Sequence, residues 1–206
     1  MSDLEPREMV TPLVDGVPET MLWTLHNRAT EAQRADGCLR DDEAIRIYHA
    51  IDYDYERSFG KAEPSHAIRS AMFDAELRAF TARHPDGVIV NLGEGLETQR
   101  FRVDAPGALW ISVDVESAMA VRERFIVSDE RHVHVVCSAL DEEWLDAIPE
   151  GRAVYITAQG LLMYFEEEAV RALLERIAER LPGARLAFDT IPRWLSRKTL
   201  KGGWKK

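Results

Sequence analysis

The chain has 206 residues, 46% of them apolar and 30% charged, which suits one globular domain that buries a sizeable core. Asp and Glu outnumber Lys and Arg by 36 to 26, and this balance argues against a nucleic-acid partner, since phosphate contacts need clustered cations. No stretch has the roughly 18 apolar residues that span a bilayer, and the acidic start lacks a secretion signal. We therefore expect a cytoplasmic protein with no membrane partner.

The two cysteines, Cys38 and Cys137, are too few and too far apart in sequence to form a disulfide framework. We expect both to be free thiols in a reducing compartment. Neither has a partner at ligand spacing, so no metal site is expected.

The first 87 residues predict an amino-terminal arm followed by a helical cap. The arm, residues 1–18, holds three prolines and little periodicity. Apolar residues at helical spacing then predict three helices. These helices are expected over residues 19–33, 41–51 and 65–83, with a polar, irregular stretch at 53–63.

From residue 88, strand-like and helix-like segments alternate, which is typical of a parallel sheet covered on both faces. Strands are expected at 88–92, 109–113, 133–137, 153–158 and 185–190, and helices at 117–125, 142–147 and 166–181. The sequence thus predicts one compact α/β domain in which a Rossmann-like core, residues 88–206, follows the cap. We also expect the C-terminal strands of the sheet to be missing or shortened. An open sheet edge would make a homodimer possible.

A Gly-x-Gly turn, Gly93-Glu94-Gly95, follows the first strand, at the end of an open α/β sheet where ligands bind. Gly93 permits a tight turn and Gly95 permits close approach of a ligand to backbone, because glycine has no Cβ. Asp114 lies 21 positions after Gly93 and ends the second strand. A carboxylate there accepts hydrogen bonds from the ribose of an adenosine, so a nucleoside ligand is expected.

Two features favour S-adenosylmethionine over a dinucleotide. Thr98 stands where the Gly-x-Gly-x-x-Gly pattern needs a third glycine. Glu94 and Glu97 place negative charge where a pyrophosphate would lie. S-adenosylmethionine carries an ammonium and a sulfonium but no phosphate, so an NAD-dependent oxidoreductase is the weaker alternative.

Several segments, in this order and spacing, resemble the motifs of one family. They are residues 16–29, 51–54, Arg69 with Phe73-Asp74, 87–101, 114–122, 138–141 with Trp144, and 159–164. Together they cover roughly residues 16 to 198 and resemble the leucine carboxyl methyltransferase and tetracenomycin polyketide O-methyltransferase family. The resemblance implies the fold of class I methyltransferases, S-adenosyl-L-methionine as cofactor and S-adenosyl-L-homocysteine as product.

The resemblance also implies a cofactor site. Arg69, and with it Arg28, matches basic positions that hold the methionine carboxylate, although a surface role stays open for Arg28. Leu140 and Asp141 match the pair beside the adenine. The full expected set is Arg28, Arg69, Gly93, Glu94, Gly95, Asp114, Val115, Ala139, Leu140, Asp141 and Gln159.

Three positions depart from the family, which usually has Ala, Asp and Glu where this chain has Glu94, Glu97 and Gln159. Gln159 replaces a carboxylate expected near the methionine ammonium and loses its charge attraction. The departures and the short C-terminus keep open a catalytically silent binding protein.

The expected activity is O-methylation of a carboxylate or phenol on a small, polyketide-like molecule, with methylation of a protein's C-terminal carboxylate as a variant. Tyr164 lies where the substrate should approach, but no catalytic base is assigned, since an ionised carboxylate needs none.

Overall fold

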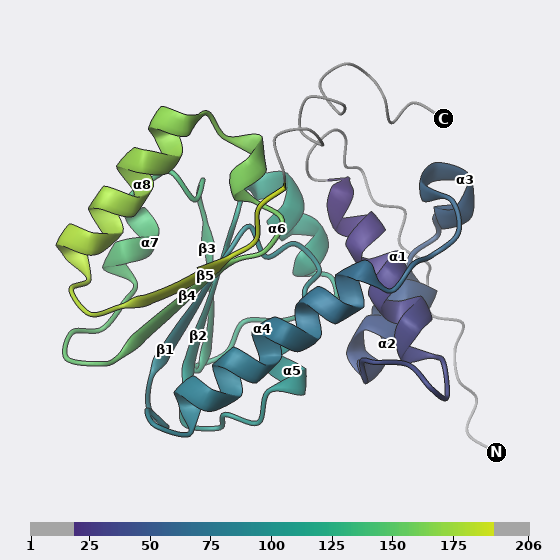
Figure 1. Cartoon of the computed structure of the whole chain (residues 1–206), viewed down its shortest axis with the longest axis horizontal. Coiled ribbons are helices and arrows are strands. Elements are labelled where there is room, and N and C mark those ends of the chain that lie inside the picture. Colours follow the sequence, from purple (N-terminus) through teal and green to yellow (C-terminus); the bar gives the residue numbers. More distant parts are fainter. Residues whose placement is uncertain (1–18, 192–206) are drawn as a thin grey trace.

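Five strands form the middle layer of the computed structural model, which describes residues 19–191 (Figure 1). The strands are β1 Val88–Leu92, β2 Leu109–Asp114, β3 His132–Val136, β4 Val154–Ala158 and β5 Arg185–Phe188. All four pairings are parallel and the order is β3-β2-β1-β4-β5. The predicted α/β fold with a parallel sheet is therefore confirmed, and chain order reverses between β1 and β4, the kind of position where such sheets bind ligands.

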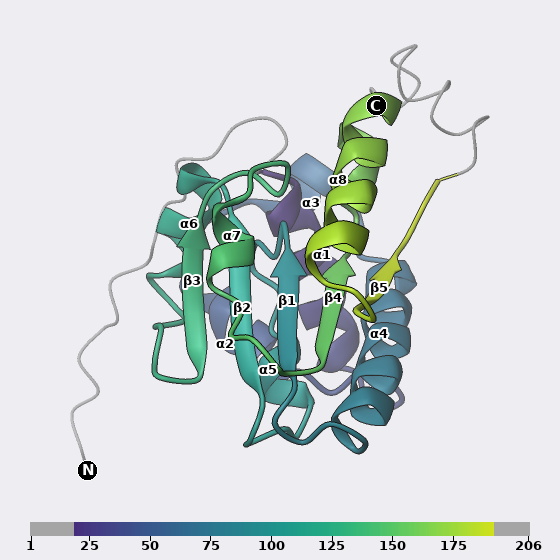
Figure 2. The same ribbon diagram turned by 90° about the vertical axis from the view of Figure 1, so that its left-hand side faces the viewer.

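The carboxyl ends of the strands meet at the upper edge of the sheet in Figure 2. Leu92 pairs with Val113 on one side and with Ala158 on the other, and Ala158 pairs with Phe188. The residues that follow these four are therefore nearly level along the edge: Gly93, Asp114, Gln159 and Asp189. This register brings together residues that are up to 96 positions apart in sequence.

Two helices, α7 Glu143–Asp146 and α8 Glu167–Arg180, cover one face of the sheet (Figure 2). Trp144, Leu173 and Ile177 are buried there against the apolar side of β1 and β4. Because both faces are covered, β1 and β4 are buried along their whole length and are mostly apolar, with Asn91 and Thr157 as their polar members. A short 3-10 turn, η1 Leu162–Tyr164, links β4 to α8.

The other face is covered by α4 Ser65–Thr81, α5 Gln99–Arg102 and α6 Glu116–Arg122. Leu77 and Phe80 of α4 pack with Ile89, Trp110 and Tyr155 of the sheet. The helix that the sequence places last in the cap is thus also a layer of the core.

The cap consists of α1 Thr20–Ala32, α2 Asp42–Ala50 and α3 Tyr55–Phe59. Asp41 begins α2 by accepting a hydrogen bond from Ala44 N at 2.9 Å, as expected of an N-cap carboxylate. The irregular stretch predicted at 53–63 is wrong in part, because Asp54 caps the short helix α3 through Arg57 N.

Within residues 19–191, β5 pairs only with β4 and forms an edge of the sheet.

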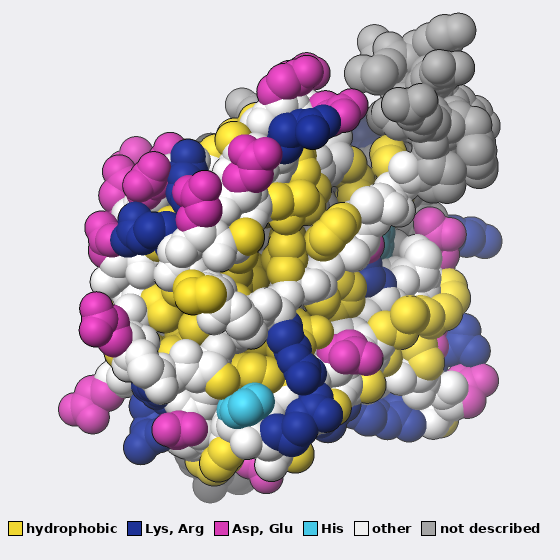
Figure 3. Space-filling model, turned by 60° about the vertical axis from the view of Figure 1, so that its left-hand side comes forward, with side chains coloured by type: hydrophobic (Ala, Val, Ile, Leu, Met, Phe, Trp, Pro, Cys, Tyr) yellow, Lys and Arg dark blue, Asp and Glu magenta, His cyan; other side chains and the backbone are white. Residues whose placement is uncertain are grey.

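Apolar side chains gather across the middle of the face in Figure 3, and charged side chains surround them. In the same part of the chain, no helix has the length and apolarity that a membrane span requires. The predicted arm at 1–18 and the segment beyond residue 191 lie outside the described residues.

Candidate functional site

The turn after β1 uses both glycines in the left-handed region, with φ of +61° at Gly93 and +51° at Gly95. A Cβ on Gly93 would lie 2.6 Å from a methyl carbon of Leu161, and one on Gly95 would lie 2.8 Å from Cβ of Met21. The missing Cβ atoms therefore let the turn pack against the protein's own side chains, from the β4 loop on one side and from α1 on the other.

Asp114 is brought into direct contact with this turn. Its Oδ2 accepts a hydrogen bond from Gly95 N at 2.7 Å, and its Oδ1 accepts one from Val115 N at 2.8 Å. Burial raises the pKa of the Asp114 carboxyl above its ordinary value, and these two N–H groups act in the opposite direction. Each oxygen keeps a further lone pair for a ligand hydroxyl, and Val115 beside it is exposed.

Glu94 and Glu97 do not face a ligand, and this corrects the argument that they would repel a pyrophosphate. Both are buried: Glu94 lies 3.1 Å from Arg122 Nη2, and Glu97 pairs with Arg102 Nη1 at 2.7 Å. Arg122 also donates to the main-chain oxygens of Gly95 and Glu97. The ion pairs of these two carboxylates stabilise the conformation of the turn, and their negative charges are paired with arginines inside the protein.

Arg28 belongs to a buried ion cluster beneath the turn, made of Arg28, Asp41, Asp74, Glu97 and Arg102. The side chain of Arg28 is wholly buried; its Nη1 donates to Asp41 at 2.9 Å and its Nη2 donates to Leu96 O at 2.7 Å. With these donors taken, the expected role of Arg28 in holding the methionine carboxylate is not what the geometry favours. The cluster instead ties α1, α2 and α4 to the segment after β1.

Arg69 lies at the carboxyl edge and meets a residue that sequence reasoning missed. Its Nη1 donates to Asp189 Oδ2 at 3.0 Å, and Asp189 Oδ1 accepts from Gly160 N at 2.5 Å. A Cβ on Gly160 would lie 2.8 Å from Arg69 Nη1, so glycine is needed for the guanidinium to approach. Asp189 follows β5 just as Gln159 follows β4. Its position after a strand was the signal in the sequence that could have identified it as a residue of the carboxyl edge.

Two buried polar atoms near Gly160 have no hydrogen-bond partner within residues 19–191, namely Nε of Arg69 and Oε1 of Gln159. Native structures leave few such atoms, and these two belong to residues at the edge where sheets of this kind bind ligands. A guanidinium donor and an amide acceptor at the same edge of the sheet fit the carboxylate and the ammonium of an amino acid. The residues present therefore fit the methionine end of S-adenosylmethionine.

The loop after β3 carries the residues expected beside the adenine. Asp141 Oδ2 accepts from Ser138 N at 2.8 Å and closes a tight turn, while Ala139 is buried and its carbonyl accepts from Trp144 Nε1 at 3.2 Å. Leu140 is half-buried at the apolar core under α7. The loop is thus held in shape by its own hydrogen bonds and by Trp144.

The ligand-type atoms of Cys137, Asp141 and Glu143 lie within 4.8 Å of one another in this loop. The sequence did not predict this proximity. Asp141 and Glu143 are exposed, and Asp141 already closes the Ser138 turn, so the group carries no metal assignment.

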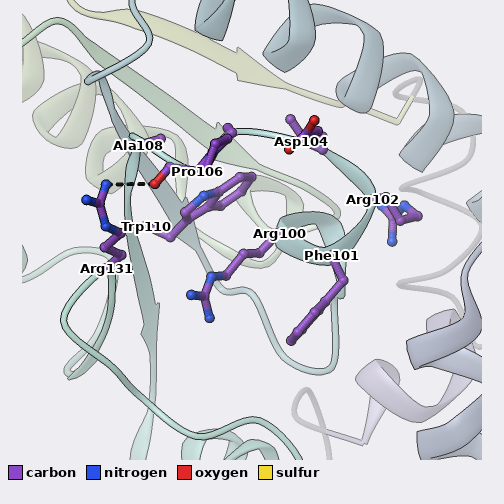
Figure 4. Close-up of a pocket in the computed structure, with 10 residues that line it drawn as sticks. Arg100, Phe101, Arg102, Asp104, Pro106, Ala108, Trp110 and Arg131 are labelled. Atoms are coloured by element: carbon purple, nitrogen blue, oxygen red, sulfur yellow. Dashed lines mark hydrogen bonds between the residues drawn. The ribbon is translucent and has the colours of Figure 1, made fainter.

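Two cavities, of about 430 and 720 Å³, lie near the amino ends of the strands, away from the predicted site. The smaller one is drawn in Figure 4, with Trp110 on its wall and Arg131 donating to Pro106 O. Its other arginines are already paired, Arg100 with Asp129 and Arg102 with the buried ion cluster. These cavities are lined by other residues than the predicted site.

Comparison with known proteins agrees with this geometry. TcmP, the tetracenomycin polyketide synthesis O-methyltransferase of Streptomyces glaucescens, is 32% identical over 185 residues, 88% of this chain and 68% of TcmP. The S-adenosyl-L-methionine-dependent methyltransferase dpfgK of Gibberella zeae is 26% identical over 180 residues, 79% of this chain and 60% of dpfgK. The chain therefore spans roughly two thirds of the length of these relatives.

The fold has a counterpart among solved structures. The N-methyltransferase NodS from Bradyrhizobium japonicum WM9 superposes with a TM-score of 0.50 over 66% of this chain and 74% of NodS, at 14% identity. At that identity the likeness concerns the fold alone. A family model described as leucine carboxyl methyltransferase matches residues 21–178. Together with the TcmP match, this confirms the predicted family and its cofactor: the chain belongs to the leucine carboxyl methyltransferase family of S-adenosylmethionine-dependent methyltransferases.

Proposed function

We propose that this protein transfers a methyl group from S-adenosyl-L-methionine to a carboxylate or phenol oxygen of a small, polyketide-like molecule. The observation that carries the proposal is the contact of Asp114 with the Gly93–Gly95 turn, level with Gln159 and Asp189 at the carboxyl edge of the sheet. The choice of oxygen as acceptor is supported by the likeness to TcmP.

Each part of the edge has a role in holding the cofactor. Asp114 accepts from the ribose hydroxyls, Arg69 donates to the carboxylate, and the Ser138–Asp141 loop borders the adenine. When bound, S-adenosylmethionine supplies an electrophilic methyl group on its sulfur. The protein then aligns the acceptor oxygen with that methyl group and excludes water.

An acceptor reaches the edge beside Tyr164, a residue that is 44% exposed at the end of η1, the 3-10 turn between β4 and α8. A carboxylate acceptor is already ionised at neutral pH and needs no base, whereas a phenol gains from one. The proposal therefore assigns no catalytic base, and a carboxylate is the simpler substrate. Methylation of a protein's C-terminal carboxylate is the variant of this reaction.

A catalytically silent binding protein is the second candidate. The packing of Leu161 on Gly93 and the neutral side chain of Gln159 favour it. A silent protein would bind the cofactor, or have lost it, and would methylate nothing. Turnover separates the two candidates.

Calorimetric titration with S-adenosylmethionine and S-adenosylhomocysteine is the first test. We expect micromolar binding, weakened at least about tenfold by Asp114→Ala, since hydrogen bonds to a charged group are lost. Asp86→Ala, an exposed aspartate at the amino end of β1, is the matched control and should bind like the wild type. A folded wild-type protein that binds neither ligand would contradict the proposal.

The acceptor is tested with cofactor carrying a labelled methyl group and panels of aromatic carboxylic acids, phenols and amines. Label in the first or second panel supports O-methylation. Label only in amines, or in none of the three despite tight cofactor binding, contradicts it. The last outcome is the one expected of the silent protein.

A further inference from the structure

Asp189 is the residue at the carboxyl edge that neither the motifs nor the family expectations single out. It follows β5 directly and contacts two segments at once, accepting from Arg69 of α4 and from Gly160 N of the β4 loop. Its side chain is 26% exposed and that of Arg69 is 18% exposed, so the pair lies at the rim of the site.

We propose that Asp189 supplies the negative charge for the cofactor's ammonium, the charge that Gln159 lacks, so that Arg69 and Asp189 together receive the amino-acid end of S-adenosylmethionine. This inference rests on the proposed function and adds to it a positioning and specificity residue. It assigns the carboxylate of the cofactor to Arg69 and the ammonium to Asp189.

The first argument is charge matching. An amino-acid end carries one negative and one positive group a few bonds apart, and its natural receptor is a cation beside an anion. Arg69 and Asp189 are such a pair, 3.0 Å apart and partly open to solvent. Gln159, level with Asp189 on the neighbouring strand, offers an acceptor without charge.

The second argument is unused hydrogen-bonding capacity. Arg69 gives one of its five donors to Asp189, and its Nε has no partner within the described residues. The Oε1 atom of Gln159 is likewise buried without a partner. Asp189 uses one lone pair of each oxygen, so each can accept once more. A zwitterion placed here would satisfy these groups together.

The third argument is the contrast with the buried ion cluster, whose carboxylates are also paired with arginines. Glu97 and Asp41 are enclosed there, and each accepts from several protein donors. Asp189 is partly exposed, and within residues 19–191 each of its oxygens accepts a single hydrogen bond, which leaves a lone pair of each for a ligand.

The test is a set of calorimetric titrations with two probes. S-adenosylhomocysteine has the amino-acid end, whereas 5′-methylthioadenosine has the nucleoside and lacks that end. For Asp189→Asn, which keeps size and removes charge, we expect the dissociation constant of S-adenosylhomocysteine to rise about tenfold or more. The dissociation constant of 5′-methylthioadenosine should change less than about twofold.

Rescue distinguishes a charge role from a merely structural one. Adding Gln159→Glu to Asp189→Asn returns a carboxylate to the neighbouring position, and we expect at least about half of the lost binding free energy to return. Asp189→Glu keeps the charge and should retain most of the affinity. The far-ultraviolet circular dichroism and melting temperature of each variant show that it is folded.

The inference is overturned if Asp189→Asn binds S-adenosylhomocysteine like the wild type, if both probes weaken equally, or if Gln159→Glu restores nothing. These outcomes differ from failure of the proposed function. If the wild type binds neither probe, the cofactor assignment itself fails. If the wild type binds both and only the Asp189 expectations fail, the proposed function stands without this residue.

Discussion

Two groups of arginines and carboxylates join segments that are far apart in sequence, and they differ in how far they are enclosed by protein. The buried ion cluster under the turn is nearly closed to solvent, and Arg102 there meets Asp41, Asp74 and Glu97 at once. The Arg69–Asp189 pair is partly exposed, with 18% of the Arg69 side chain and 26% of the Asp189 side chain open to solvent. Satisfied, enclosed charges stabilise a fold, whereas charges with unused capacity at a rim can receive a ligand.

The largest expected effect comes from breaking the buried ion cluster. Arg102→Met leaves three buried carboxylates with Arg28 as the remaining arginine inside the cluster, and we expect a loss of about 3–5 kcal/mol in the free energy of unfolding. Urea denaturation measures it. Arg171→Met, which removes an exposed pair with Glu167, is the control and should leave the midpoint unchanged. A loss no larger than that of the control would show that the cluster does not stabilise the fold.

The second effect is a pH dependence of stability that arises at His66, whose pKa is affected by Arg69 and Asp189. Burial, and then the positive charges of Arg69 and Arg28, lower the pKa of His66 to about 4, while Asp189 and Glu97 act against this. Asn27 Nδ2 lies 2.7 Å from His66 Nδ1, a contact that suits a neutral ring. The unfolded chain protonates His66 near pH 6.5, so its contribution to stability is complete above that pH and is lost as the pH falls toward about 4.

This loss should not exceed about 1.4 kcal/mol per pH unit for one proton. Proton NMR titration of His66 in the wild type and in Arg69→Met is the direct measurement. The pKa of His66 should rise in the variant, since a neighbouring positive charge is removed. An unchanged pKa would show that the positive charge of Arg69 does not act on the His66 ring, which would contradict the position of that guanidinium beside His66.

The smallest effect should come from Arg69→Met on stability. The Arg69–Asp189 pair is partly exposed, so we expect a loss of at most about 1 kcal/mol in the same urea experiment. Binding of S-adenosylhomocysteine should fall sharply in this variant. The opposite result, a large loss of stability with binding retained, would remove the distinction between the two groups.

Much of the fold was predictable from local pattern. Short, mostly apolar runs indicated β1 and β4, and Asp41 before an apolar periodicity indicated the start of α2, because burial and capping act over a few residues. The helix α3 was missed because its five residues are too few to show a period.

The contact of Asp114 with the glycine turn was predictable from the sequence, whereas the direction of the neighbouring charged side chains was not. Asp114 beside the glycine turn follows from spacing, since a strand end and a turn have fixed places in such a sheet. The direction of Glu94, Glu97 and Arg28 does not, because each turns inward to a partner between 13 and 69 residues away. A sequence shows the sign of each charged side chain but not the direction in which that side chain points.

The sequence by itself determined the parallel α/β architecture, the family and the cofactor, because these depend on periodicity and on the order of motifs along the chain. Tertiary structure alone decided which charged side chains are enclosed and paired inside the protein and which lie at the rim of the proposed site. Arg28 and Arg69 look alike as helix arginines, yet one is enclosed by acceptors and the other lies beside Asp189 at the rim. The reason is that pairing depends on distances between segments far apart in sequence, which only packing sets.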